Sequence, residues 1–202
     1  MIGIIDYKMC NLQSVKNSLD YLKIRNKFVD SPSEIKNCDK LILPGVGAFG
    51  IAMERLNKIG FTKQIKEFAN QGNPLLGICL GMQLLMDSSE EYGHYSGLGL
   101  IKGGVFDFRN KVRNLPVPHV GWNEVIKSKE SKLLKNVESG SSFYFVHSFY
   151  CDLTNRDEVI ATTDYGFKFD SVLEIGNIYG CQFHPEKSQQ DGLSILRNFN
   201  EI

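Results

Sequence analysis

The sequence lacks the features that place a chain in a membrane or on a nucleic acid. No apolar run approaches the roughly 18 residues needed to cross a bilayer, and the opening MIGIIDYK lacks the basic stretch and long apolar core of a signal peptide. Lys+Arg and Asp+Glu balance at 23 each, without a basic cluster that carries interleaved aromatic residues. We therefore expect neither a nucleic acid nor a membrane as a partner.

The cysteines form neither a disulfide framework nor a zinc-binding pattern. They are five in number, scattered along the chain and free of CxxC spacing: Cys10, Cys38, Cys79, Cys151 and Cys181. An odd number of isolated cysteines is typical of reduced thiols in the cytoplasm, and we expect no metal site and no cofactor.

The first part of the chain alternates strand-like and helix-like segments. Apolar runs at 1–5, 27–30 and 40–43 indicate strands, the last ending at Pro44. Helical spacing covers 12–22, 49–57 and 61–70, and Asn11 stands where it could cap the first of these helices. This alternation predicts an α/β fold with an open, mixed, mostly parallel sheet flanked by helices on both faces.

The pattern changes after Tyr92 to short, glycine-punctuated strands. Such segments occur at 104–108, 121–126, 142–150, 159–163 and 171–183, and a helical pattern closes the chain at 189–199. We expect a β-rich C-terminal half within one domain that spans 1–202, because the chain contains no linker, repeat or low-complexity stretch.

The stretch PLLGICLGMQLL, residues 74–85, predicts a strand, a tight turn and a helix with Cys79 at the apex. Glycine on both sides of the cysteine relieves crowding where the chain reverses. A thiol at the start of a helix is favoured as thiolate, the form that attacks carbon. A buried structural cysteine explains GxCxG equally well when the motif is taken alone.

A nucleophilic cysteine needs a base and a group that orients the base. Of four histidines, His94 is interpreted as a surface residue, and His119 and His147 as core or site-lining residues. His184 stands in FHPE, and in an extended segment residues i and i+2 face the same side, roughly 7 Å apart. Glu186 could therefore orient His184. Together with the cysteine turn, this favours a Cys-His-Glu triad.

The glycine-rich loop PGVGAFG, residues 44–50, follows a predicted parallel strand. Ligands of open α/β sheets bind outside the carboxyl ends of the strands, where this loop and the cysteine turn would both lie. The loop lacks the lysine and Ser/Thr of a P-loop and does not fit GxGxxG, so nucleotide binding is not predicted. We assign it to an oxyanion hole, which backbone N–H groups can form.

These elements, in this order, resemble the class I (triad) glutamine amidotransferases. Within that family the segments LILPGVGAFG, PLLGICLGMQLL, VPHVGWNEV, FYFVHSFY and YGCQFHPEKS look like those of the glutaminase subunits of imidazole glycerol phosphate synthases. The resemblance spans almost the whole chain and implies a flavodoxin-like amidotransferase fold. It also implies Cys79 as nucleophile, His184 as general base and acid, and Glu186 as its orienting group.

The resemblance implies further roles in the same site. The oxyanion donors would be the backbone N–H of Leu80 and one from the Val46–Gly47 region, and Gln83 would help to hold the substrate. The backbone groups of the substrate would pair with three consecutive residues, His147, Ser148 and Phe149.

The activity implied is hydrolysis of L-glutamine to glutamate and ammonia, with the ammonia channelled to a (β/α)₈-barrel cyclase in a heterodimer. That partner would convert the ribulosyl precursor PRFAR to imidazole glycerol phosphate and AICAR in histidine biosynthesis. In such a pair the oxyanion hole would stay unformed until the partner carries its own substrate.

One departure leaves the partner open. Where the family usually has DYGMGN, this chain has DYKMCN, so Lys8 and Cys10 replace two glycines. The first alternative is a paralogous subunit that supplies ammonia for an amidino group on a surface sugar. Two further alternatives are a cysteine peptidase that cleaves γ-glutamyl bonds and a binding subunit with a silent site.

Overall fold

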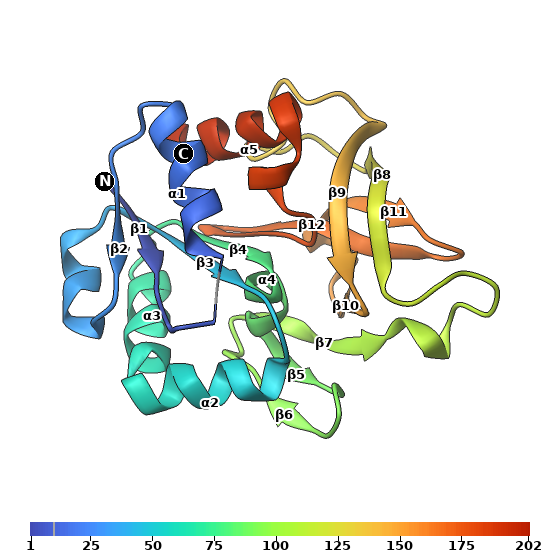
Figure 1. Ribbon diagram of the computed structural model, residues 1–202, viewed down its shortest axis with the longest axis horizontal. Coiled ribbons are helices and arrows are strands. Elements are labelled where there is room, and N and C mark those ends of the chain that lie inside the picture. Colours follow the sequence, from blue (N-terminus) through green and yellow to red (C-terminus); the bar gives the residue numbers. More distant parts are fainter. Residues whose placement is uncertain (10) are drawn as a thin grey trace.

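The computed structural model describes residues 1–9 and 11–202, so the question raised by Cys10 lies outside the described residues. One path of hydrogen-bonded strands runs through the molecule in the order β2-β1-β3-β4-β13-β12-β10-β7-β5-β6. Strands β11, β8 and β9 branch from β12, and Figure 1 shows β8 and β9 on the side far from the N-terminus.

The N-terminal half supplies the parallel part of the sheet. Its elements are β1 (Ile2–Ile5), α1 (Leu12–Tyr21), β2 (Asn26–Val29), η1 (Pro32–Asn37), β3 (Lys40–Gly45), α2 (Phe49–Ile59), α3 (Phe61–Asn70), β4 (Leu75–Cys79) and α4 (Leu80–Leu84). Strand β4 lies between β3 and β13 and is parallel to both. It is therefore a central strand whose carboxyl end lies between two other carboxyl ends.

The C-terminal half is β-rich, as the sequence predicts. Its elements are β5 (Met86–Ser89), β6 (Tyr95–Ser96), β7 (Ile101–Asp107), η2 (Phe108–Asn110), β8 (His119–Lys127), β9 (Ser141–His147), β10 (Phe149–Leu153), η3 (Arg156–Glu158), β11 (Val159–Asp164), β12 (Lys168–Ile175), β13 (Ile178–Cys181), η4 (Pro185–Lys187) and α5 (Gln189–Glu201). Most neighbours in this half are antiparallel.

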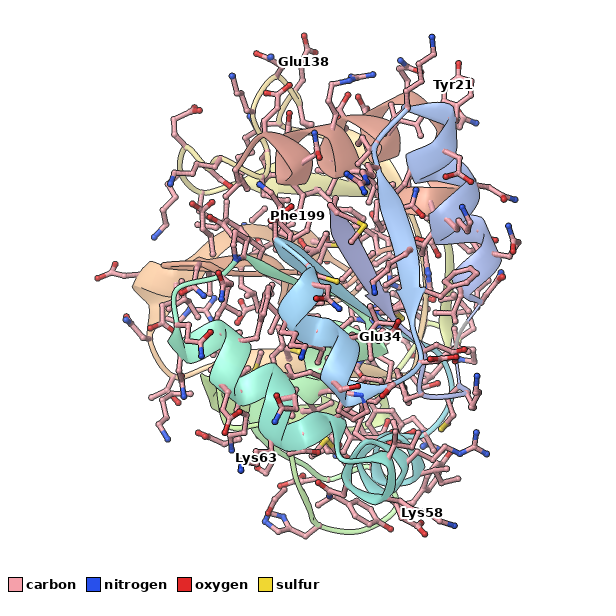
Figure 2. All side chains as sticks on the ribbon, turned by 90° about the vertical axis from the view of Figure 1, so that its left-hand side faces the viewer. Tyr21, Glu34, Lys58, Lys63, Glu138 and Phe199 are labelled. Carbon is pink, nitrogen blue, oxygen red and sulfur yellow. The ribbon has the colours of Figure 1, made fainter. Side chains whose placement is uncertain are left out.

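Helices cover both faces of the sheet. Helices α2 and α3 lie on one side and α1 and α5 on the other, and two clusters of buried apolar side chains follow this division (Figure 1). Leu56 and Phe61 belong to the first cluster, and Leu19 and Phe199 to the second. Figure 2 shows Phe199 inside the molecule, with charged side chains such as Lys63 at its periphery. Each helix buries the apolar face that its spacing predicts.

Some element boundaries differ from the sequence expectation. Strand β3 continues through Pro44, because its pairing with β1 ends at Ile42 whereas its pairing with β4 continues to Gly45. Asn11 precedes α1 but makes no side-chain cap hydrogen bond. The single strand expected at 142–150 is two, β9 and β10, which are separated at Ser148 and pair with different neighbours.

The helix expected after Cys79 is short. Helix α4 has five residues and is followed after Leu85 by β5, which was not predicted from the sequence, and neither was β6. None of the helices within residues 1–9 and 11–202 is long and apolar enough to cross a membrane.

Candidate active site

Cys79 and His184 come together because they follow neighbouring parallel strands. Cys79 is the last residue of β4, and His184 lies three residues beyond the end of β13. The two strands are paired in register, with Cys181 beside Ile78. The glycine loop follows β3 on the other side of β4, with Gly45 beside Cys79. The site thus lies at the carboxyl edge of the sheet, as expected for an open α/β fold.

Cys79 sits at a strained turn. Its φ of 53° and ψ of −111° fall in a region that residues other than glycine rarely adopt. The turn is also tightly packed, because a Cβ on Gly81 would lie 1.7 Å from the carbonyl oxygen of Leu43, and one on Gly77 would lie 2.7 Å from that of Gly81. Both glycines flanking the cysteine are therefore required by close backbone approach as well as by the turn.

His184 and Glu186 form a buried pair. Nδ1 of His184 lies 2.7 Å from Oε1 of Glu186, and both side chains are almost fully buried. The reason differs from the sequence expectation, since the chain turns into η4 at Pro185 and is not extended through Glu186. Ser188 holds this turn by donating to the His184 carbonyl at 2.6 Å. Within the described residues, Nε2 of His184 has no hydrogen-bond partner.

The pKa of His184 is raised to about 10. Burial alone would lower it, but attraction to the negative charge of Cys79 and the hydrogen bond with Glu186 outweigh that effect. At neutral pH the imidazole of His184 is therefore protonated beside the sulfur of Cys79. That arrangement places a proton donor next to a candidate nucleophile.

A pocket of about 320 Å³ surrounds the two side chains. It brings together nine of the residues predicted for the site, which are Val46, Gly47, Cys79, Leu80, Gln83, His147, Ser148, Phe149 and His184. Glu186 lies behind His184, outside this lining. The remaining lining residues are Glu91, Tyr92, Pro118 and Val146. The structure thus gathers the predicted residues in one place, and their roles stay predictions.

The glycine loop carries Gly47 in the left-handed region, with φ of 96°. The N–H of Val46 donates to the carbonyl of Met9 at 3.2 Å, and that contact ties it to the loop after β1. In this loop Lys8 adopts φ of 65° and its N–H donates to Asp6 at 2.9 Å. A lysine thus occupies a conformation that suits glycine better, so the loop tolerates this replacement at some cost in strain.

His147 belongs to the pocket, whereas His119 lies behind it in the core. Nδ1 of His147 is 2.7 Å from the Phe149 carbonyl, and its Nε2 is 3.1 Å from Nδ1 of His119. Burial lowers the pKa of His119 to about 4 and that of His147 to about 3. Both imidazoles are therefore neutral at neutral pH and serve as hydrogen-bonding groups. His94 is exposed, as expected.

Glu91 is a pocket residue that the sequence analysis missed. It is 7 % exposed, and its Oε2 accepts a hydrogen bond from the Phe49 N–H at 2.6 Å. Burial raises its pKa, although the bond from Phe49 opposes this shift. Because Glu91 stands in the polar run SSEEY, no signal in its local sequence separates it from a surface charge. A buried carboxylate here can bind a cationic group.

No group of three or more His, Cys, Asp or Glu side chains able to hold a metal ion occurs among residues 1–9 and 11–202.

Comparison with known proteins identifies the family. The model of "Glutamine amidotransferase class-I" matches residues 3–202. The HisH subunit of imidazole glycerol phosphate synthase from Chlorobaculum tepidum is 47% identical over 203 residues, covering 100% of both chains. That of Sulfurimonas denitrificans is 48% identical, covering 100% of this chain and 98% of the other. The PurLQS structure from Thermotoga maritima has a TM-score of 0.75 at 17% identity, covering 98% of this chain and 96% of that one, and shows the shared fold. The chain belongs to the class I glutamine amidotransferase family, and within it to the HisH subunits.

Proposed function

We infer that this chain is the glutaminase subunit of an imidazole glycerol phosphate synthase and hydrolyses L-glutamine to glutamate and ammonia. The observation that carries this inference is the pocket in which Cys79 faces His184, in a chain that is similar to HisH subunits over its full length. The product ammonia serves histidine biosynthesis, and no observation favours the surface-sugar alternative.

Catalysis begins when the thiolate of Cys79 attacks the carboxamide carbon of glutamine. His184, oriented by Glu186, gives its Nε2 proton to the departing nitrogen, and the C–N bond breaks to release ammonia and leave a glutamyl thioester. His184 then takes a proton from water, the resulting hydroxide attacks the thioester, and glutamate leaves as the thiolate is regenerated. The oxyanion formed in each step would be held by the N–H of Leu80 and one from the Val46–Gly47 loop.

The pocket offers complementary groups for the rest of the substrate. We assign Glu91 to the α-ammonium of glutamine, because it is the carboxylate among the pocket residues. The segment His147, Ser148 and Phe149 would pair with the backbone groups of the substrate. The amide N–H groups of Gln83 donate to Phe149 and Gln182. Gln83 would therefore contact the substrate through its side-chain oxygen, Oε1.

Replacing Glu91 with glutamine is expected to raise the KM for glutamine about tenfold or more, with a much smaller change in kcat. The reason is that a hydrogen bond to a charged group contributes about 1.5–3 kcal/mol, and this bond is present in the bound substrate and in the transition state alike. Steady-state glutaminase assays of the complex measure both constants. Glu90→Gln is the matched control, because this neighbouring carboxylate is exposed, and equal KM values for the two variants would contradict the assignment.

We assign the partner to the (β/α)₈-barrel cyclase class, as a heterodimer in the cytoplasm. The four described cysteines are free thiols, which supports a reducing compartment. Ammonia released into water would be protonated and lose its nucleophilicity, so transfer must run through a dry channel. The bond from Val46 N–H to Met9 keeps one candidate oxyanion donor occupied. Partner binding that breaks this bond would switch hydrolysis on.

The test is a pull-down of the barrel partner from the native cell, followed by glutaminase assays of the complex with and without PRFAR. We expect PRFAR to stimulate hydrolysis about tenfold or more, the scale of an ordinary coupling free energy between sites. Glutamine hydrolysis that is insensitive to PRFAR would argue against histidine biosynthesis. Efficient hydrolysis of γ-glutamyl peptides by the isolated chain would favour the peptidase alternative instead.

A further inference from the structure

Gln182 places a buried amide beside the sulfur of Cys79, and the proposed catalytic steps do not use this amide. Its side chain is 0 % exposed, and its Nε2 donates to Cys79 Sγ at 3.7 Å. Its backbone N–H donates to the Ser171 carbonyl at 2.9 Å, which fixes the residue against β12. The amide therefore has little freedom to move away from the sulfur.

The orientation of this amide is imposed by a carbonyl group on another strand. The Phe149 carbonyl can only accept, so the Gln83 atom 3.0 Å from it is Nε2. The same Nε2 donates to Oε1 of Gln182 at 3.1 Å. Gln182 must then turn its own N–H groups to the other side, where Cys79 lies. If the Gln182 amide were flipped, its NH₂ group would face the NH₂ group of Gln83, and its oxygen would face the sulfur of Cys79.

The Phe149 carbonyl is itself held in place from behind. His147 donates to it from Nδ1 at 2.7 Å, so Nε2 of His147 accepts from Nδ1 of His119 at 3.1 Å. Nε2 of His119 then accepts from the amide of Asn123 at 3.3 Å. The tautomers of both neutral imidazoles follow from their partners. Hydrogen bonds thus connect Asn123 to Cys79, and the Phe149 carbonyl between them accepts from both His147 and Gln83.

We propose that Gln182 stabilises the thiolate of Cys79 by donating an amide N–H to its sulfur, in a direction set by the Phe149 carbonyl through Gln83. The proposal rests on the proposed function in that Cys79 is the nucleophile. The competing contact is the Val146 carbonyl, to which a Cys79 thiol could donate at 4.0 Å. The Gln182 contact is the shorter of the two, and a hydrogen bond from N–H favours the charged form of sulfur.

Other ionisable groups also act on this sulfur. The imidazolium of His184 attracts a thiolate at Cys79. A negative charge on Cys79 also helps to raise the pKa of two buried thiols, Cys151 on β10 and Cys181 on β13, although burial is the larger cause. The remaining ionisable groups of the pocket and its surroundings are Glu91, Tyr92, His147 and Glu186. A Gln182 variant alters none of these groups. A change in the pH dependence of Cys79 reactivity in that variant therefore measures the effect of the amide.

The test is the pH profile of alkylation of Cys79 by iodoacetamide, followed by mass spectrometry of the peptide that contains it. In Gln182→Met, which removes the donor at similar volume, we expect the midpoint of the profile to move up by about one pH unit, the lower range for one hydrogen bond to a charged group. In Gln182→Glu, which presents an acceptor to the sulfur, we expect a larger upward shift.

The control is Asn198→Met, which removes another buried amide, one that donates to the Leu133 and Lys135 carbonyls at 2.9 and 2.7 Å. We expect its profile to match the wild type. An unchanged midpoint in Gln182→Met overturns the proposal, and so does a shift in Gln182→Glu no larger than that in Gln182→Met. If Gln182→Glu does not fold, the methionine variant decides alone. Wild-type Cys79 that resists labelling by diazo-norleucine would instead overturn its role as nucleophile.

Discussion

Replacing Cys79 with alanine is expected to lower the glutamine-dependent activity of the complex by at least about 10³-fold, the scale on which removal of a nucleophile acts. Among the described residues that line the pocket, Cys79 carries the only thiol. Ser148 also lines the pocket, but it does not lie at the strained turn, so its hydroxyl does not replace the thiol. The measurement is glutamate release by the complex with the proposed barrel partner in the presence of PRFAR.

Two comparisons separate lost chemistry from lost structure. Cys38→Ala removes another buried thiol, in the core near η1 and away from the pocket, and we expect it to keep most of the activity. The cyclase activity of the Cys79→Ala complex with ammonium salt in place of glutamine should also persist, because the partner is intact. Glutamine hydrolysis by Cys79→Ala close to that of Cys38→Ala would contradict the assigned nucleophile.

The proximity of Cys79, His184 and Glu186 could be predicted because each lies in a short local pattern. The turn around Cys79 needs small residues on both sides, and GxCxG reports that need directly. His184 and Glu186 are two residues apart, so their contact requires only a local turn. The alternation of strands and helices then places Cys79 and the end of β13 at one sheet edge. Family membership and fold class were confirmed by the comparisons.

The rest of the site depends on contacts between distant segments. Glu91 enters the pocket because its carboxylate accepts from Phe49, at the start of a helix 42 residues away. Gln182 contacts Cys79 across 103 residues. The local sequence around Glu91 and Gln182 therefore does not indicate either contact. The short α4 is a further case, since its packing against the Leu43 carbonyl is a property of the sheet.

The φ of Lys8 is the clearest limit of sequence reasoning. A lysine argues against a left-handed conformation, yet its φ is 65°. The N–H and the ammonium group of Lys8 both donate to the Asp6 carboxylate, at 2.9 and 2.8 Å. These bonds offset part of the strain. The conformation of Lys8 is thus compatible with its surroundings, so the lysine at this position does not count against the HisH assignment.

Acidification from pH 6.5 to pH 4.5 is expected to destabilise the fold through the buried histidine pair, by roughly 2 to 3 kcal/mol for each imidazole. In the unfolded chain histidine takes up a proton near pH 6.5. The folded state lowers the pKa of His119 to about 4 and that of His147 to about 3. Between these values only the unfolded chain binds the protons, so the stability present above pH 6.5 is lost as the pH falls.

Urea unfolding at pH 7 and pH 4.5 measures the loss of the free energy of unfolding on acidification, which is compared between the wild type and histidine variants. The double variant His119→Gln, His147→Gln should be less stable at pH 7 but should lose less free energy of unfolding on acidification than the wild type. Glu91 and Asp170 act in the opposite sense, because burial raises their pKa, and they are common to both proteins.

The control is His94→Gln, a change at an exposed histidine, and its pH dependence should follow that of the wild type. If the double variant does not fold, His119→Gln alone should show about half the difference, and an unchanged pH dependence would contradict neutral buried imidazoles.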